Sequence, residues 1–457
     1  MSTGIRAVLA PLLASAVILS CGTTSQANSV DSNTSLVSLP SNTTAAPEKL
    51  PTSTATSAVQ VPENTPTTTT EPEKLPTSTT TGAVQVPEST PTTTREPERL
   101  PTSDCYLSSD RDAGVTGWEP ALSLSHKRPG YRLKSTGTIE IVVLFAEFQD
   151  VIARETTQSI FSIISPDAEE FINDQSYGRL QLSFRPHHSW LQLRSNASVY
   201  ASAIKTYEGH RNFMQEAVDL ADNKVDFRGA DAVLVIATPN AREIGYGPAW
   251  MGQPSDPITA DGQVITNGVT SGADLLHWRD GWYPHELGHS LGLPDLYGAS
   301  IPARGGWTRP FSLMDLISGS APGYMGYSRW ILQWLDDSQV HCIQNDITLE
   351  LTPLALKEGS KLAIVPLTPS TALVAEVRQA IGYDAGLTRE GVVVYAVDTN
   401  NNGRNGGSYG AGPMEVLNDA NALRMGESVT HSGVTFKVLP SQTDKEILQI
   451  TFENATP

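Results

Sequence analysis

Hydrophobic positions between residues 138 and 240 follow two kinds of pattern. Continuous apolar runs at 138–150 and 230–240 predict buried strands, and alternating apolar and polar positions at 179–186 and 189–193 predict half-buried strands. Apolar residues at helical spacing predict one helix at 156–178, ending at Gly178, and another at 211–222. Strands that alternate with helices predict an α/β or α+β region with a mainly parallel or mixed sheet.

The pattern changes after His341, where long helical periodicity stops. Short runs rich in β-branched and aromatic residues, separated by Gly, Pro and Asn, predict strands at 347–354, 361–367, 372–379, 391–398, 434–440 and 447–453. We therefore expect a β-rich domain of the β-sandwich kind over residues 341–457, after a first domain at 105–340.

One loop of this β-rich region begins like a calcium-binding loop. Asp398, Asn400 and Asn402 occupy alternate positions, and Gly403 is the sixth residue. The twelfth residue is Tyr409, where such a loop needs a bidentate Glu. Ca²⁺ binding and a plain Asn/Gly-rich loop are both open interpretations.

Residues 25–103 have a different composition, dominated by Thr, Pro, Ser and Glu. A unit at 47–71 recurs at 72–96, and a third copy opens at residue 97. Each unit holds too few apolar residues to build a core that offsets the entropy of ordering the chain. This composition predicts that residues 22–104 form a disordered, extended Thr/Pro-rich stalk.

The N-terminus predicts export from the cell. A single cation, Arg6, precedes an apolar run from Ala7 to Leu19, which is too short to span a bilayer but suits a signal peptide at residues 1–21. The sequence ILSC resembles a bacterial lipobox, so lipidation at Cys21 would tether the mature protein to a membrane surface. Ordinary cleavage after Ala27 is the alternative and would release it to the medium.

The other two cysteines predict a disulfide. Cys21 lies outside the folded part under either interpretation of the N-terminus, which leaves Cys105 and Cys342. An oxidising compartment would tend to pair these two thiols. Two separate buried thiols are the alternative.

Charge limits the class of partner. The 457-residue chain has a formal net charge of -18, and its basic residues do not cluster. Nucleic acid is therefore not an expected partner, because phosphate binding requires clustered Lys and Arg.

We expect the protein to be a monomer and to attach to a membrane only through an N-terminal lipid.

The segment HELGHSLGLPDLYG, residues 285–298, carries the main candidate chemistry. On a helix, His285 and His289 project from one face about a turn apart, which suits two ligands of one Zn²⁺. Glu286 lies beside them, placed to accept a proton from the attacking water. Gly292 permits a left-handed turn that ends the helix, and the turn brings Asp295 back as a third ligand.

Two further observations bear on this predicted zinc site. A methionine turn is expected beneath it, and Met314 in SLMD (312–315) supplies one, although core packing alone would also explain this residue. The competing third ligand is a downstream glutamate. Glu350 is the first glutamate after Asp295, and it lies in a strand-like run beyond the proposed catalytic domain. A turn-capping role is the alternative for Asp295.

At these residues the chain resembles the metzincin-like zinc peptidases, and among them the immune inhibitor A family of bacterial secreted metallopeptidases. The resemblance is carried by HELGHSLGLPDLYG and, more weakly, by segments at 142–150, 176–184, 225–236, 326–335 and 374–398. It implies a metzincin catalytic fold and an endopeptidase with His285, His289 and Asp295 as zinc ligands and Glu286 as general base.

The chain departs from the family at two points. A Thr/Pro-rich stalk fills the place where family members often carry a folded propeptide, which puts latency in question. Some metzincin branches place a tyrosine two residues after the methionine of the turn, where this chain has Leu316. Tyr324 and Tyr327 are then the candidates for stabilising the oxyanion, with packing beside Trp330 and Trp334 as their alternative role.

These observations predict an exported, surface-tethered zinc endopeptidase that acts on protein or peptide substrates. The alternative from another class is a non-catalytic surface binding protein that retains the protease fold. An intact Glu286 favours the enzyme, because a chain without turnover has no physical need for the base.

Overall fold

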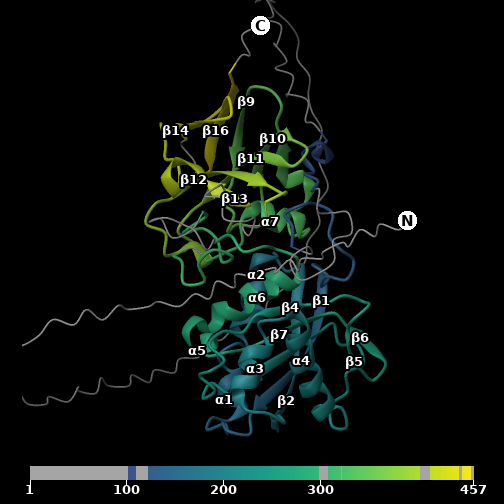
Figure 1. Cartoon of the computed structure of the whole chain (residues 1–457). Coiled ribbons are helices and arrows are strands. Elements are labelled where there is room, and N and C mark those ends of the chain that lie inside the picture. The colour runs from purple at the N-terminus through teal and green to yellow at the C-terminus, as the bar shows by residue number, and fades with distance from the viewer. Residues whose placement is uncertain are drawn as a thin grey trace, which may run out of the picture. The chain divides into compact units, whose positions relative to one another are not determined.

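The computed structural model describes residues 101–109, 122–297, 307–320, 322–401, 412–441 and 445–453. The predicted signal peptide with Cys21, the stalk as far as residue 100, and the loop residues 402–411 lie outside this part of the chain. The described residues have mixed α and β content, with several sheets and short helices (Figure 1). Among them, no helix is both long enough and apolar enough to cross a membrane.

The first sheet is mixed and has the strand order β2-β1-β3-β7-β4. Its strands are β1 (Gly137–Glu147), β2 (Leu180–Gln192), β3 (Ala232–Ala237), β4 (Ala249–Met251) and β7 (Asn267–Thr270). β1 pairs in parallel with β2 and β3, and β3 pairs in parallel with β7. β4 lies antiparallel to β7 at one edge of the sheet, and a small hairpin of β5 (Ile258–Ala260) and β6 (Gln263–Ile265) precedes β7.

Helices cover both faces of this sheet. They are α1 (Thr157–Phe161), α2 (Asp167–Gln175), α3 (Ala197–Ala203), α4 (Tyr207–Ala221), α5 (Asp274–Trp278) and α6 (Trp282–Ser290). Alternate residues of β1 point to opposite faces, so Val143 belongs to the cluster that includes α2 and α6, whereas Leu144 belongs to the cluster with α3 and α4. Burial on both faces explains why β1 is a continuous apolar run.

Two expected elements differ from the prediction. The helix expected at 156–178 is interrupted: α1 ends at Phe161, and α2 begins after Pro166. Proline has no N–H to donate to a preceding turn, so one helix cannot run through it. The two strands expected at 179–193 form one strand, β2, which contains Pro186. β2 is an edge strand, where the missing N–H of proline is tolerated.

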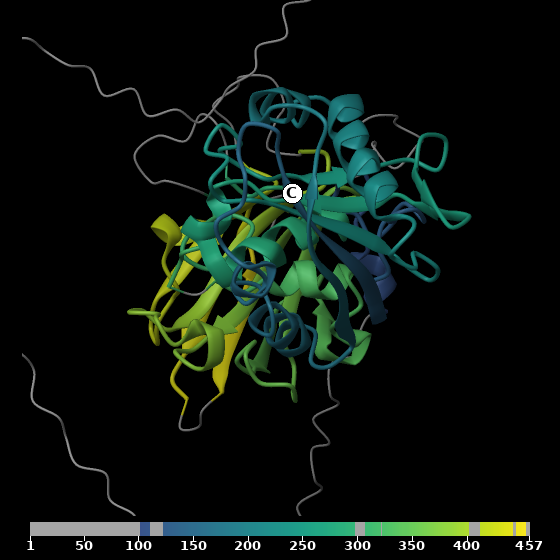
Figure 2. The ribbon, with the colours of Figure 1, turned by 90° about the horizontal axis from the view of Figure 1, so that it is seen from below.

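Two further sheets follow residue 340. One has the order β13-β12-β11-β10-β8, built from β8 (Val340–Cys342), β10 (Leu362–Thr368), β11 (Thr371–Arg378), β12 (Gly391–Asp398) and β13 (Met414–Val416). The other has the order β14-β15-β16-β9, built from β9 (Ile347–Leu351), β14 (Ser428–His431), β15 (Val434–Leu439) and β16 (Glu446–Phe452). The yellow strands of the second sheet lie beside the green strands of the first (Figure 2).

The β11 strand joins two parts of the core. Leu373, Ala375 and Val377 belong to the apolar cluster shared with β15 and β16. Ala372 and Val374 point the other way, into the cluster that also contains α2 and α6. The β-rich region therefore shares a continuous apolar core with the region that carries HExxH.

A disulfide joins Cys105 to Cys342 in the structure, as the cysteine count predicts, with their Cα atoms 5.7 Å apart. Both cysteines are buried. The bridge closes a sequence separation of 237 residues and connects the start of the described chain to β8.

Candidate metal centre

Helix α6 carries both histidines of the candidate site and ends where the spacing predicts. Pro284 lies in its first turn, where a missing N–H costs nothing. Gly292 has φ +98°, in the left-handed region that favours glycine, and Leu293 N–H donates to the carbonyl of Gly288 at 2.9 Å. The turn at Gly292 sends the chain back toward the helix, which brings Asp295 to the histidines.

The end of α6 is held by a segment that precedes β1. Arg128 donates to the Leu291 carbonyl through Nε at 3.0 Å and Nη2 at 2.6 Å. Leu133 N–H donates to the carbonyl of Ser290 at 3.1 Å. These donors satisfy carbonyls that a helix end leaves without intrahelical partners, and the Arg128 cation lies at the negative end of the helix dipole. No motif in the sequence marks this segment for that role.

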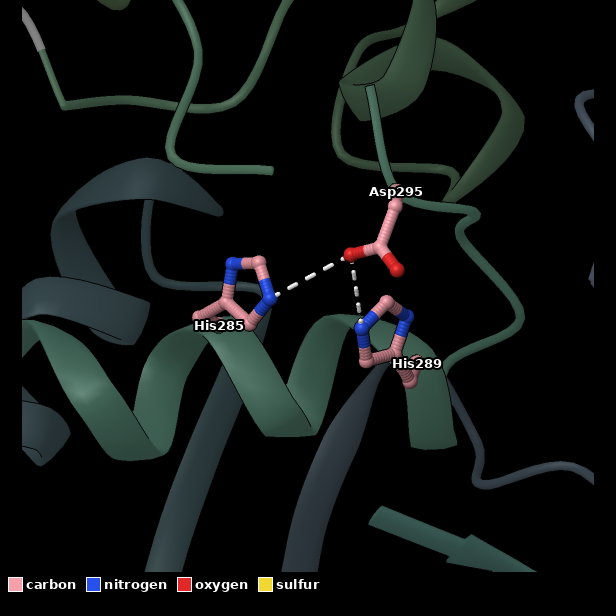
Figure 3. Close-up of side chains that lie close together, drawn as sticks. All are labelled: His285, His289 and Asp295. Atoms are coloured by element: carbon pink, nitrogen blue, oxygen red, sulfur yellow. Dashed lines mark ion pairs between the residues drawn. The ribbon is translucent and has the colours of Figure 1, made fainter. Parts of the chain in front are cut away.

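His285, His289 and Asp295 converge on one point (Figure 3). Oδ1 of Asp295 lies 3.4 Å from Nε2 of His285 and 3.2 Å from Nε2 of His289. All three side chains are buried, and their candidate ligand atoms lie within 4.8 Å of one another. Zn²⁺ bonds of 2.0–2.1 Å in a tetrahedral site separate neighbouring ligand atoms by about 3.3 Å, so the two His–Asp distances fit this ion.

The hydrogen-bond partners of the two rings indicate their tautomer. Nδ1 of His285 lies 3.0 Å from the carbonyl oxygen of Leu313, and Nδ1 of His289 lies 2.8 Å from that of Leu293. A carbonyl can only accept, so each Nδ1 carries hydrogen, and a neutral ring then has its lone pair on Nε2. Both lone pairs face a carboxylate oxygen. Either a bound cation or protonation of the imidazoles would relieve that repulsion.

The carboxylates of the site have shifted pKa values. Burial alone would raise the pKa of Asp295, but His289 and His285 outweigh it and hold that pKa well below its usual range. Burial raises the pKa of Glu286 to about 8. His285 and the Ala249 amide oppose this rise, whereas the carboxylates of Asp274 and Asp295 add to it. A dication between the ligands would favour the ionised form of Glu286.

Glu286 does not belong to the converging triad. Its Oε2 accepts from the backbone N–H of Ala249 in the edge strand β4, at 2.7 Å. The general-base candidate is thus held between the ligand helix and the edge of the sheet. Asp274 supports the same region, since it accepts from Gly247 N–H at 2.9 Å and from Nε1 of Trp282 at 3.2 Å.

Met314 lies against α6 at Gly288, between the two histidines. A Cβ on Gly288 would come within 2.6 Å of the Met314 sulfur, so a larger residue there would require the Met314 side chain to move. The Met314 carbonyl also accepts from the N–H of Leu296 at 2.8 Å. Met314 is therefore buried against the ligand helix and tied to the residue that follows Asp295.

The two tyrosines considered for the oxyanion lie in the core. Tyr324 is fully buried, and its hydroxyl donates to the Pro284 carbonyl at 2.6 Å. Tyr327 is also fully buried, with its ring edge-on to Trp330. These positions favour the packing role for both. Tyr297 was not singled out, yet it is half exposed, and its ring is stacked on His285 with centroids 6.3 Å apart.

The remaining candidate residues lie elsewhere. Glu350, the rival third ligand, is half exposed on β9 and pairs with Lys445 at 2.9 Å. Asp398 accepts from the N–H of Asn400 at 2.9 Å, an ordinary local turn, while Asn402, Gly403 and Tyr409 lie outside the described residues. Only position in the sequence, two residues after Asp295, could have drawn attention to Tyr297.

Comparison with known proteins found no family and no curated protein that matches this chain.

Proposed function

We propose that this protein is a zinc-dependent endopeptidase. The observation that carries the proposal is the convergence of His285, His289 and Asp295, each buried, with inter-ligand distances that suit Zn²⁺ and with Glu286 beside them. The resemblance of residues 285–298 to the immune inhibitor A family supports the same assignment. On this basis we also propose a metzincin-like catalytic region and a β-sandwich for the sheets that follow residue 340.

The chain's own residues supply orientation and proton transfer. A bound Zn²⁺ would polarise the scissile carbonyl and lower the pKa of a water molecule to about 7. Glu286 accepts the proton of the attacking water and passes it to the leaving amine. The carbonyls of Leu313 and Leu293 keep the ligand rings in the tautomer that points Nε2 at the centre of the site.

The edge strand β4 holds the proposed general base. β4 lies at the end of its sheet, and the backbone N–H of Ala249 donates to Oε2 of Glu286. All three residues of β4 are buried, so the contribution that we assign to this strand is to position that carboxylate.

Zinc analysis combined with casein cleavage tests the proposal. We expect one zinc per chain, cleavage that stops when a chelator removes the zinc, and recovery when zinc is added back. Protein that holds stoichiometric zinc but never cleaves casein or a peptide library would favour the non-catalytic binding protein. Protein that holds no zinc would favour a buried ion-pair cluster.

Export with a lipid anchor is the accompanying proposal for location. It rests on the apolar run before Cys21 and on the stalk composition of residues 22–104. Mass spectrometry of the mature N-terminus tests it, because a diacylated Cys21 would anchor the protein to the cell. Unacylated protein found entirely in the medium would refute the anchor and leave the peptidase proposal untouched.

A further inference from the structure

A buried ion network in the β-rich region includes none of the residues assigned to the metal centre. Arg378, the last residue of β11, is fully buried, and its Nε donates to Oε1 of Glu376 at 2.7 Å. Its Nη1 donates to Oδ1 of Asp384 at 2.9 Å. Burial lowers the pKa of Arg378, but the two carboxylates outweigh it and raise that pKa, so the guanidinium remains charged. Buried ion pairs often contribute little to the free energy of unfolding, so stability alone does not explain a fully buried guanidinium.

The network extends from β11 to the segments that precede the β-rich region. Nη2 of Arg378 donates to the carbonyl of Phe311 at 2.8 Å and to that of Tyr324 at 3.4 Å. Oε2 of Glu376 accepts from the N–H of Gly326, the first residue of α7 (Gly326–Ile331), at 2.7 Å. The guanidinium therefore bridges two carboxylates of the β-rich region and two carbonyls of the region that carries the site.

The Phe311 segment also orients the metal ligands. Two residues after Phe311, the carbonyl of Leu313 accepts from Nδ1 of His285. The next carbonyl, that of Met314, accepts from the N–H of Leu296, which follows the third ligand. A displacement of this segment would thus move the hydrogen-bond partner of His285, and it would move Asp295 through the backbone of Leu296. A ligand moved by a fraction of an ångström no longer matches the bond length and angle that the metal requires.

We propose that Arg378 is a positioning residue for the metal centre: its guanidinium holds the Phe311 carbonyl, and thereby the Leu313 carbonyl that orients His285. The inference rests on the proposed zinc site. It makes the β-rich region part of the scaffold of that site, not an independent substrate-binding module. The shared apolar core of β11 and α6 supports this continuity.

Arg378→Lys is the informative variant. Lysine keeps the positive charge near Glu376 and Asp384, but its single ammonium cannot reproduce the fork that also reaches the Phe311 carbonyl. Arg389→Lys is the matched control. Arg389 also lies in the β-rich region, where its Nε donates to the Ala422 carbonyl at 2.7 Å and its side chain pairs with Glu427, so the same exchange is made away from the Phe311 segment.

The experiment compares full-length wild-type and variant proteins loaded with Zn²⁺ or Co²⁺. Chelator competition gives the zinc affinity, and the visible absorption of bound Co²⁺ reports the ligand geometry of the folded protein. Loss of a direct outer partner of a ligand weakens metal binding about 10–100-fold. Arg378 acts on such a partner through the chain, so we expect a loss of about tenfold and altered Co²⁺ bands for Arg378→Lys. Arg389→Lys should match the wild type in both measurements.

Two negative results have different meanings. A folded Arg378→Lys protein with wild-type zinc affinity and an unchanged Co²⁺ spectrum would overturn the positioning role while leaving the zinc site in place. A wild-type protein that binds neither ion would overturn the zinc site and this inference together. If Arg378→Lys fails to fold, Arg378→Met combined with Glu376→Gln and Asp384→Asn removes the guanidinium without leaving buried carboxylates unpaired. This variant should shift the Co²⁺ bands in the same way, and unchanged bands would overturn the inference.

Discussion

Replacing Asp295 with Asn separates the two explanations for the buried triad. Asparagine preserves the size of the side chain but removes its charge and is a poorer ligand for Zn²⁺. If the triad is a metal site, the carboxylate supplies one of three protein ligands. If it is an ion-pair cluster, the carboxylate is the counter-charge for protonated imidazoles 3.4 and 3.2 Å away.

The two explanations predict different free energies. Zinc at a free concentration of 1,000 times its Kd stabilises the folded protein by about 4.1 kcal/mol. If loss of one ligand weakens binding roughly 100-fold, the same zinc concentration stabilises Asp295→Asn by only about 1.4 kcal/mol. The variant should therefore lose about 2.7 kcal/mol of zinc-dependent stability. In the ion-pair case, removing one partner of a buried pair costs about 3–5 kcal/mol without zinc.

Urea unfolding followed by tryptophan fluorescence, in metal-buffered zinc and in chelator, measures both quantities. Glu350→Gln is the control, because Glu350 is the rival ligand and forms a half-exposed pair with Lys445. We expect the zinc-dependent shift in wild type and in Glu350→Gln, and its reduction in Asp295→Asn. An undiminished shift in Asp295→Asn would remove Asp295 from the metal site. Destabilisation of that variant in chelator, with no zinc effect on wild type, would refute the metal site altogether.

Three further predictions concern single features. Glu286→Gln should keep the zinc content of wild type and lose turnover, because an amide cannot take up the proton; activity above a tenth of wild type would contradict the general-base role. Burial lowers the pKa of His210 to about 3. As the pH falls below about 6.5, the imidazole therefore binds a proton in the unfolded state but not in the folded state, and the free energy of unfolding falls. His210→Asn should reduce the loss of unfolding free energy between pH 6.5 and 5 by roughly 2 kcal/mol in urea titrations, and an unchanged pH dependence would count against it. Replacing Cys105 and Cys342 together with Ser should lower the unfolding free energy by about 5 kcal/mol, since the bridge closes a 237-residue separation; a loss below about 1 kcal/mol would show that the bridge does not constrain the unfolded chain.

Much of the local structure follows from the sequence because its causes are local. The apolar runs of β1, β3 and β12 and the helical spacing of α4 identify these elements, because the spacing of apolar residues can be seen within a few neighbouring positions. The candidate site is local in the same sense. His285, Glu286, His289 and Asp295 lie within the eleven residues 285–295, and one helical turn and one glycine turn suffice to bring the two imidazoles and the Asp295 carboxylate together.

Interactions between distant segments were decided only in the folded chain. The Leu313 carbonyl that orients His285, the Ala249 N–H that holds Glu286, and the Arg378 contact with Phe311 join residues 28, 37 and 67 positions apart. Hydrophobic periodicity shows which face of an element is buried, but it does not say which other element covers that face. For the same reason the sequence left two roles open for Tyr324 and Tyr327, oxyanion stabilisation and core packing. Packing against α6 and Trp330 buries both side chains. The convergence of His285, His289 and Asp295 was therefore predictable from the order of these residues, whereas the groups that orient them depend on tertiary packing.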